Sequence, residues 1–148
     1  MNAKAQSYPE LKFENQVCFP LYSAANAVVR AYRPYLEPLG LTYLQYMALL
    51  VLWQSSPLTV KELGQRLHLD SGTLTPLLKR LEGKGLVQRK RSSEDERARL
   101  ISVTDEGLAL RQQAEDIPRQ LACSIGLSQA KGRELKRLCE QLLEAVQG

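Results

Sequence analysis

The chain has 148 residues, of which 20 are Lys or Arg and 16 are Asp or Glu, and 44% of it is hydrophobic. This length and composition exclude a disordered chain, a collagen-like fibre and two independent domains, and they favour one globular domain over residues 1–148. The longest apolar run covers residues 46–53, whereas a bilayer-spanning helix needs roughly 20 residues. The N-terminus has no hydrophobic signal core, so we expect no membrane partner and a cytoplasmic protein.

The cysteines and the histidine are too few for the usual structural metal site. Cys18, Cys123 and Cys139 form no CxxC pair, and the chain has one histidine. A structural zinc site usually takes four such ligands. We therefore expect no metal and no cofactor, and reduced thiols in a reducing compartment.

The net charge of +4 is concentrated in one stretch of the chain. Residues 79–99 hold eight basic and four acidic side chains, and the rest of the chain holds 12 of each. An excess of positive charge in one short stretch is typical of a phosphate-binding surface, although a solvated charged face would give the same count.

The first half of the chain is expected to be helical. Residues 20–36 show a helical pattern that begins at Pro20 and ends or kinks at the following prolines and Gly40. Thr42 is expected to cap a second helix over residues 43–54, and the nearly continuous apolar content of that helix places it in the core.

Two further helices follow, joined by a tight turn. Thr59 and Glu62 form a capping-box signature for a short helix that ends near His68. The next helix, over residues 71–84, carries four leucines at i, i+3, i+4 and i+7, and Gly85 is expected to end it. This pair has the order of a helix-turn-helix.

The face of the 71–84 helix opposite its leucines is polar. Its side chains are small or basic, namely Ser71, Thr73, Thr75, Pro76, Lys79 and Arg80. We expect Pro76 in the early turns, where a lost backbone donor costs least. A helix that reads the major groove requires such a row, because it must meet base edges and phosphates together.

A charged hairpin is expected to follow the polar-faced helix. Residues 86–91 and 99–103 have strand-like patterns and flank the polar stretch 92–98. The arginines on or beside this hairpin are Arg89, Arg91, Arg97 and Arg99. They suit a wing that lies along the DNA backbone or enters the minor groove. The fold is therefore predicted to be mainly α with a small β-hairpin, a winged helix-turn-helix over about residues 42–104.

Helices also flank the winged helix-turn-helix. One is expected from Asp105 to about Ser124, with a kink before Pro118, and a last helix is expected to open at Ser128. The regions of about 11–37 and 105–147 thus carry apolar stripes that the winged helix does not need. These stripes indicate a homodimer, although they could also complete a monomeric core. A two-fold dimer would set two reading helices about 34 Å apart, matching a palindromic site in double-stranded DNA.

The three cysteines differ in their expected surroundings. Cys139 lies on the apolar stripe of the last helix, so we expect a small buried hydrophobe. Cys123 lies about 200° around its helix from the neighbouring apolar stripe, so we expect it to be exposed. Cys18 lies at or just outside a helix N-terminus, where backbone N–H groups and the helix dipole favour the thiolate. A reactive sulfur is expected there, with an inert one as the alternative.

Several segments resemble the MarR-type regulators, and within them the organic hydroperoxide resistance repressors (OhrR-like). The resemblance spans about residues 11–143. The matching segments are VCFPLYS (17–23), AYRP (31–34) and GLTYLQY (40–46) in the sensor half, DSGTLTPLLKRLE (70–82) in the recognition helix, and DER (95–97) in the wing.

The resemblance implies a dimeric repressor in which organic hydroperoxides oxidise the Cys18 thiolate to a sulfenic acid. Tyr32 and Tyr43 match family tyrosines that hydrogen-bond this sulfur from the partner subunit, and Tyr22 matches a third position near the site. Cys18 and Tyr32 are 14 residues apart, about 21 Å along a helix, which agrees with a partner in trans. Cys123 matches the resolving thiol of the two-cysteine branch, which forms an intersubunit disulfide with the oxidised cysteine.

The resemblance also implies the DNA contacts. The polar face of the 71–84 helix would enter the major groove, and Arg97, positioned by Asp95, would enter the minor groove of a pseudo-palindromic operator. Arg89 and Arg91 complete the expected contacts.

Two other functions remain open on the sequence. One is a MarR-type regulator that a small aromatic or lipophilic ligand releases from DNA, with Cys18 incidental. The other is a thiol peroxidase that turns over peroxide catalytically. His68 lies on the expected DNA-binding domain, which argues against a Cys–His hydrolase, and we expect the chain not to be an enzyme.

Overall fold

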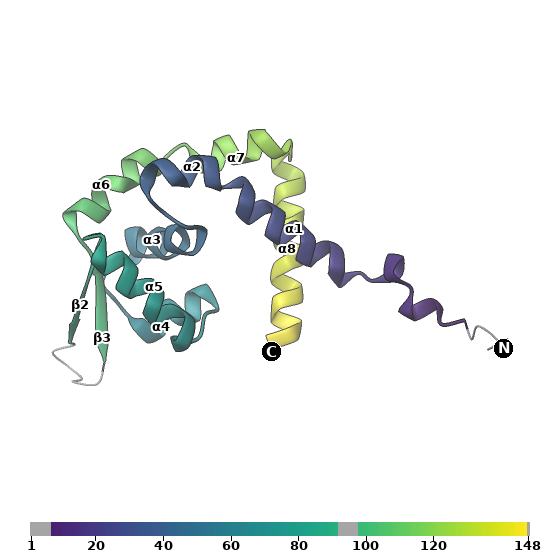
Figure 1. Ribbon diagram of the computed structural model, residues 1–148, viewed down its shortest axis with the longest axis horizontal. Coiled ribbons are helices and arrows are strands. Elements are labelled where there is room, and N and C mark those ends of the chain that lie inside the picture. The colour runs from purple at the N-terminus through teal and green to yellow at the C-terminus, as the bar shows by residue number, and fades with distance from the viewer. Residues whose placement is uncertain (1–6, 92–97, 148) are drawn as a thin grey trace, which may run out of the picture. The chain divides into compact units, whose positions relative to one another are not determined.

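The computed structural model describes residues 7–91 and 98–147 (Figure 1). The chain divides into two compact units, residues 1–43 and 44–148. The expectation of a single domain over residues 1–148 stays a prediction. No helix among the described residues is long and apolar enough to cross a membrane.

The first unit is helical. Its elements are η1 (Pro9–Leu11), η2 (Phe13–Asn15), α1 (Cys18–Ala31), α2 (Arg33–Leu36) and η3 (Glu37–Leu39). The predicted start at Pro20 is wrong, because α1 begins at Cys18. The N–H groups of the first turn have no acceptor within the helix, so a proline is tolerated at its third residue as well as its first. Pro34 interrupts the helical pattern as predicted, and the chain turns at Gly40 with a φ of 68°.

The second unit holds the remaining elements. They are α3 (Tyr43–Ser55, whose first residue lies in the first unit), β1 (Leu58–Thr59), α4 (Val60–Leu67), α5 (Ser71–Gly83), β2 (Val87–Arg91), β3 (Arg99–Val103), α6 (Asp105–Ala114), α7 (Ile117–Ile125) and α8 (Gln129–Gln147). This order confirms the predicted mainly α fold with a small β-hairpin.

Side-chain caps set the starts of the two helix-turn-helix elements. The Glu62 N–H donates to Thr59 Oγ1 and the Thr59 N–H donates to Glu62 Oε2, both at 3.1 Å, so the predicted capping box is confirmed. Asp70 Oδ1 accepts the Thr73 N–H at 2.8 Å at the start of α5. Gly85 follows the end of α5 with a φ of 75°, the left-handed conformation that favours glycine there.

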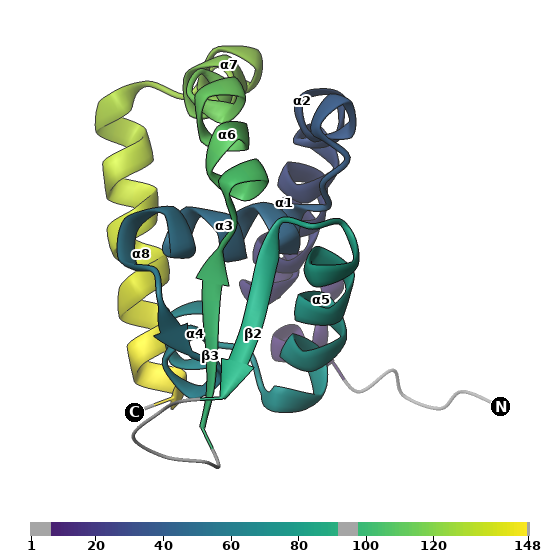
Figure 2. The same ribbon diagram turned by 90° about the vertical axis from the view of Figure 1, so that its left-hand side faces the viewer.

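The described strands form a three-stranded antiparallel sheet in the order β1-β3-β2. Figure 2 shows β2 and β3 as a hairpin beside α5. β1 was not predicted, because two residues are too few to show an alternating pattern. Leu58 of β1 lies opposite Ile101 of β3, so the hairpin is joined to the segment that opens α4.

Leucines dominate the core of the second unit. As predicted, the four leucines of the α5 stripe are buried, and α3 contributes further buried side chains. The buried residues of these two helices are Gln45, Tyr46, Ala48, Leu49, Leu52, Leu74, Leu77, Leu78 and Leu81. Burial of each of these leucines contributes about 1.5–3 kcal/mol to the stability of the fold. This packing holds α5 in place with its polar face toward solvent.

The helix predicted over residues 105–124 is two helices. α6 ends at Ala114 and α7 begins at Ile117, with Pro118 as its second residue. A proline inside a helix removes one backbone hydrogen bond, because it has no N–H group. In the first turn of a helix no such bond is lost, so a proline fits there. The predicted kink is therefore a full break at residues 115–116.

Gly107 lies where the start of α6 packs directly against the base of the hairpin. A Cβ atom at this position would lie 2.1 Å from the backbone oxygen of Leu86 and 2.7 Å from Cγ2 of Val103. The Gly107 carbonyl also accepts a hydrogen bond from Trp53 Nε1 at 2.8 Å. The joint between α6 and the hairpin therefore has no room for a side chain.

Gly107→Ala should destabilise the protein by about 1–3 kcal/mol, because the backbone must shift to admit the methyl group. Thermal or urea unfolding measures the effect. Gly83→Ala is the matched control, since nothing lies within 4 Å of an added Cβ there, and its effect should stay within about 0.5 kcal/mol. Equal stability of the two variants would contradict the close packing at Gly107.

Candidate functional site

The polar face of α5 is exposed to solvent, as predicted. Thr75 is half-buried, and the exposed residues of this face are Ser71, Thr73, Pro76, Lys79 and Arg80. Because the opposite side of α5 is packed into the core, these side chains form a surface that can approach DNA without unfolding the helix.

Pro76 lies in the early turns of α5, as predicted, but past the first turn. It is the sixth residue of the helix, in the second turn, and α5 continues past it to Gly83. The N–H groups that lack an intrahelical acceptor end three residues into a helix, so the helix has one backbone hydrogen bond fewer at Pro76. The predicted position in the early turns is therefore confirmed, but the reason given for it, that a lost donor costs least there, is wrong. The seven residues that follow Pro76 are still helical.

Arg89 on β2 is held by Glu82 of α5. Both Nε and Nη2 of Arg89 donate to Glu82 Oε1, at 3.2 and 3.1 Å, and the Arg89 backbone N–H donates to Glu82 Oε2 at 3.1 Å. These hydrogen bonds lower the pKa of the Glu82 carboxyl. The guanidinium of Arg89 is therefore engaged within the folded unit.

The end of the hairpin carries two arginines face to face. Arg91 lies directly opposite Arg99 in the strand register, and both are exposed. Like charges directly opposite each other are unfavourable, so this pair favours an anion between or beside its side chains. The predicted contacts Asp95 and Arg97 lie outside the described residues.

A buried glutamine anchors the end of α5, and sequence reasoning missed it. Gln45 of α3 is 2% exposed, and its Oε1 accepts a hydrogen bond from Lys84 Nζ at 2.9 Å. Lys84 directly follows α5. The available signal was a single glutamine inside the otherwise apolar core of the helix over residues 43–54.

Cys18 is exposed and is the first residue of α1. Three aromatic residues that are near Cys18 in sequence form a cluster of rings. The ring centroids of Phe13 and Phe19 are 4.7 Å apart, and those of Phe19 and Tyr22 are 6.4 Å apart. The thiol thus lies at a helix N-terminus beside an exposed aromatic cluster, a setting that suits a reactive sulfur and an apolar reactant.

Tyr32 and Tyr43 lie together, with ring centroids 5.0 Å apart. Burial raises the pKa of the Tyr43 phenol, so its hydroxyl stays protonated and able to donate a hydrogen bond at neutral pH. Tyr32 follows the last residue of α1, whereas Cys18 is the first. The 14-residue helix is about 21 Å long, so these tyrosines do not reach Cys18 of the same chain.

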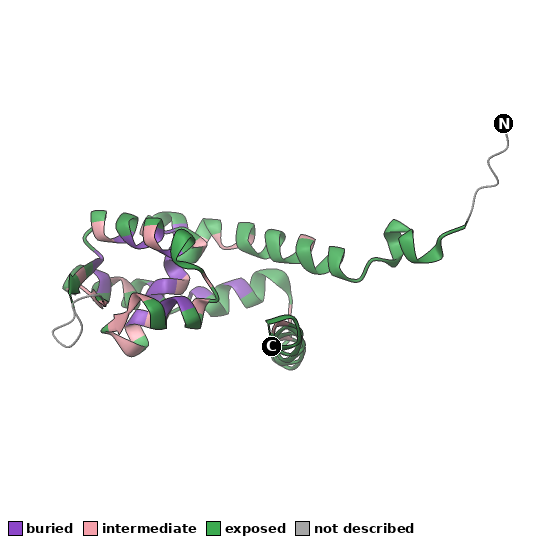
Figure 3. Cartoon of the chain, turned by 90° about the horizontal axis from the view of Figure 1, so that it is seen from below, coloured by how far each residue is buried: buried purple, intermediate pink, exposed green. Residues whose placement is uncertain are grey.

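Cys123 and Cys139 are both exposed. The exposure of Cys123, on α7, agrees with its prediction, but the predicted burial of Cys139 is wrong within the chain. No described residue of α8 is buried, nor is any of α1 (Figure 3). The stripe on which Cys139 lies is itself uncovered, with Leu135 51% and Leu142 41% exposed.

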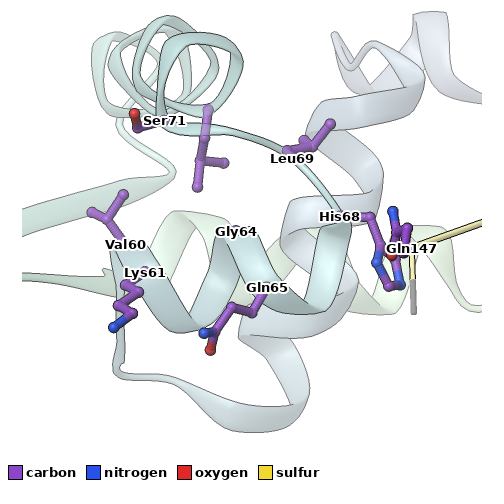
Figure 4. A pocket seen from close by; sticks show the side chains of 9 residues that line it. Val60, Lys61, Gly64, Gln65, His68, Leu69, Ser71 and Gln147 are labelled. Carbon is purple, nitrogen blue, oxygen red and sulfur yellow. The ribbon is translucent and has the colours of Figure 1, made fainter. Parts of the chain in front are cut away.

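A pocket of about 780 Å³ lies between α4 and α5 (Figure 4). His68, which ends α4 in a left-handed conformation with a φ of 54°, lines it together with Gln147. Among the described residues that line this pocket, none is a cysteine or an acid. His68 is therefore not placed to act with a thiol.

The sequence is similar to known regulators. The protein-family model described as "MarR family" matches residues 41–98 of this chain. The chain is 50% identical to the organic hydroperoxide resistance transcriptional regulator of Bacillus subtilis (strain 168) over 131 residues, which are 88% of this chain and 87% of that protein.

The fold is similar to AbfR of Staphylococcus epidermidis, which has been solved in several states. Reduced AbfR bound to DNA matches with a TM-score of 0.77 and 34% identity over 91% of this chain and 94% of that one. Over-oxidised AbfR bound to DNA matches with a TM-score of 0.74 and 35% identity over 90% and 93%. Disulfide-formed AbfR matches with a TM-score of 0.64 and 35% identity over 88% and 91%.

Proposed function

The chain belongs to the MarR family of transcriptional regulators, and from this premise we propose that it is a dimeric repressor that organic hydroperoxides release from DNA through oxidation of Cys18. The observation that carries the proposal is the exposed thiol at the first residue of α1, beside a cluster of aromatic rings. The half-identical Bacillus subtilis relative is named for organic hydroperoxide resistance, which supports the choice of oxidant.

DNA binding is proposed to use α5 and the hairpin. α5 would enter the major groove with its exposed polar face, and the wing would follow the backbone and the minor groove. AbfR is solved in complex with DNA, which supports this mode for a chain of similar fold. The proposed contacts are Ser71, Thr73, Thr75, Pro76, Lys79, Arg80 and Arg91, with Arg97 positioned by Asp95.

A homodimer is proposed to form through the regions of about 11–37 and 105–147. The exposed apolar side chains of α1 and α8 support it, because large apolar patches on a folded chain usually mark an interface. Phe19 is 45% exposed and Leu138 48% exposed. Burying these side chains against a second copy would place two α5 helices for a pseudo-palindromic site.

The redox step is proposed to begin with the Cys18 thiolate. Its sulfur attacks the terminal oxygen of the hydroperoxide and the O–O bond breaks. The leaving alkoxide takes a proton from water, so the products are a sulfenic acid at Cys18 and the corresponding alcohol. Tyr32 and Tyr43 of the partner subunit would donate hydrogen bonds to the reacting sulfur. The length of α1 and the raised pKa of Tyr43 support this role, and Tyr22 lies close enough in sequence to Cys18 to contribute after oxidation.

Release from DNA is proposed to require a disulfide with Cys123 of the other chain. The Cys123 thiolate attacks the sulfenic sulfur, an S–S bond forms and the S–O bond breaks. The leaving hydroxide takes a proton from the solvent and becomes water. Over-oxidised AbfR is solved bound to DNA, so in that protein oxidation alone is compatible with binding. A disulfide needs Cα atoms within about 7 Å, and drawing two helices together to that distance can change the spacing of the reading helices.

Cys123→Ser should lose the covalent dimer band on non-reducing gels after one equivalent of cumene hydroperoxide, and should stay bound to DNA. The DNA is a duplex of about 30 base pairs, which is long enough for two half-sites. It is obtained from a randomised pool by enrichment with the reduced wild-type protein, and we call it the selected duplex. Cys139→Ser is the matched control and should keep both the band and the release. A band that persists in Cys123→Ser and disappears in Cys139→Ser would transfer the resolving role to Cys139.

A further inference from the structure

We propose that Glu82 is a positioning residue for DNA recognition: its carboxylate fastens strand β2 to α5, so that the recognition helix and the wing meet DNA as one rigid unit. The inference rests on the DNA-binding part of the proposed function and is independent of the redox step.

The contact between Glu82 and Arg89 uses both carboxylate oxygens. Oε1 accepts the two guanidinium hydrogen bonds, and Oε2 accepts the backbone N–H of the same residue at 3.1 Å. A side chain that binds both the backbone and the guanidinium of one residue fixes the strand itself as well as the arginine. The carboxylate thus holds the position of β2 relative to α5.

The backbone bond fills an open edge of the sheet. Among the strands that the structure describes, β2 is the outer one in the order β1-β3-β2 and pairs only with β3. An edge strand presents N–H groups that no neighbouring strand accepts. Glu82 supplies the acceptor at Arg89, in the middle of β2, where a further strand would otherwise pair.

The contact lies between the two groups of proposed DNA-facing residues. Lys79 and Arg80 precede Glu82 on α5, and Arg91 follows Arg89 toward the end of β2. The hydrogen bond from Lys84 to the buried Gln45 holds the same end of α5 against α3. The contact between Glu82 and Arg89 therefore joins α5 to β2 close in sequence to both groups of proposed DNA-facing residues.

Positioning and simple charge predict opposite effects of removing the Glu82 carboxylate. Glu82→Gln raises the net charge of the chain from +4 by one unit, and removing a negative charge near a DNA-facing surface should strengthen binding. It also frees Arg89 to contact a phosphate. A positioning role requires the reverse, because an amide cannot accept all three hydrogen bonds.

The experiment compares affinity for the selected duplex with affinity for a scrambled duplex of equal length, using fluorescence anisotropy of the reduced protein across a salt series. Glu82→Gln should weaken binding of the selected duplex about five- to tenfold and leave the scrambled duplex unchanged or bound more tightly. Arg89→Gln should weaken it similarly, and the double variant should be no worse than either single one. Both Arg89 variants keep the backbone N–H, but Arg89→Lys also keeps the cation, so it should stay within about threefold of wild type.

Glu10→Gln is the matched control, because Glu10 is an exposed glutamate of η1 that lies outside α5, the hairpin and the two regions proposed to form the dimer. It makes the same charge change and should leave both affinities near those of wild type. Unfolding temperatures of all variants identify any loss of folded protein.

Tighter binding of the selected duplex by Glu82→Gln would overturn the positioning role. A fall of about 0.9 in the salt slope of Arg89→Gln would also overturn it, because that fall marks a direct phosphate contact. A wild-type protein that enriches no duplex would contradict the proposed function itself, and would overturn the positioning role with it.

Discussion

Cys18→Ser should bind the selected duplex with the affinity of the wild-type protein and should stay bound when cumene hydroperoxide is added. Serine is nearly the same size as cysteine, and Cys18 is exposed, so the fold and the α5 surface should not change. The hydroxyl of serine does not form a sulfenic acid, because the chemistry requires a thiolate sulfur. Anisotropy of the labelled duplex during a peroxide titration measures the response, and the wild-type protein should lose its DNA under the same conditions.

Cys139→Ser is the control for loss of a thiol elsewhere in the chain, and it should respond to peroxide as the wild type does. Release of Cys18→Ser by peroxide would remove Cys18 as the sensor. Release of the same variant by a small aromatic compound without peroxide would support a ligand-controlled regulator. Sustained peroxide consumption by the wild-type protein with a thiol reductant would support a thiol peroxidase.

Lys79→Ala/Arg80→Ala should weaken binding of the selected duplex about 10- to 100-fold at physiological salt. Both side chains are exposed on the solvent face of α5, so their removal should leave the leucine-packed side intact. If each contacts one phosphate, the plot of log affinity against log salt should lose about 0.9 of its slope per residue. The measurement is a salt series of anisotropy titrations.

The control for this double variant removes the same charge away from α5. Arg111→Ala/Lys131→Ala changes two exposed basic residues on α6 and α8. Size-exclusion chromatography checks that it is still a dimer, and as a dimer it should change the affinity much less. Similar losses in the two double variants would show that binding depends on net charge alone, which would contradict α5 as the DNA-reading element.

The fold was predictable wherever local chemistry determines structure. The capping box at Thr59, the leucine stripe of α5 and the hairpin strands each follow from residues close in sequence, and each is confirmed. The start of α1 was misplaced because a proline fits anywhere in a first turn. β1 was missed because it exists only through its pairing with β3, which no local pattern records.

The candidate site was predictable as residue types but not as contacts. The exposed face of α5 and the position of Cys18 near a helix start follow from spacing. The hydrogen bonds from Arg89 to Glu82 and from Lys84 to Gln45 depend on how α5 packs against β2 and α3. The sequence does not show this packing, so Arg89 was predicted only as a DNA contact. The burial predicted for Cys139 failed because an apolar stripe indicates that a surface becomes covered, and not whether the same chain covers it.

The most direct test of the redox switch measures DNA release and Cys18 oxidation in the same sample. Wild-type protein bound to the labelled selected duplex is titrated with cumene hydroperoxide, and each point is read by anisotropy and by mass spectrometry of the peptides that contain Cys18 and Cys123. We expect DNA to be lost in proportion to the disulfide-linked Cys18 and Cys123 peptides and to be bound again after reduction with dithiothreitol. Release of DNA while Cys18 remains a free thiol would contradict the account.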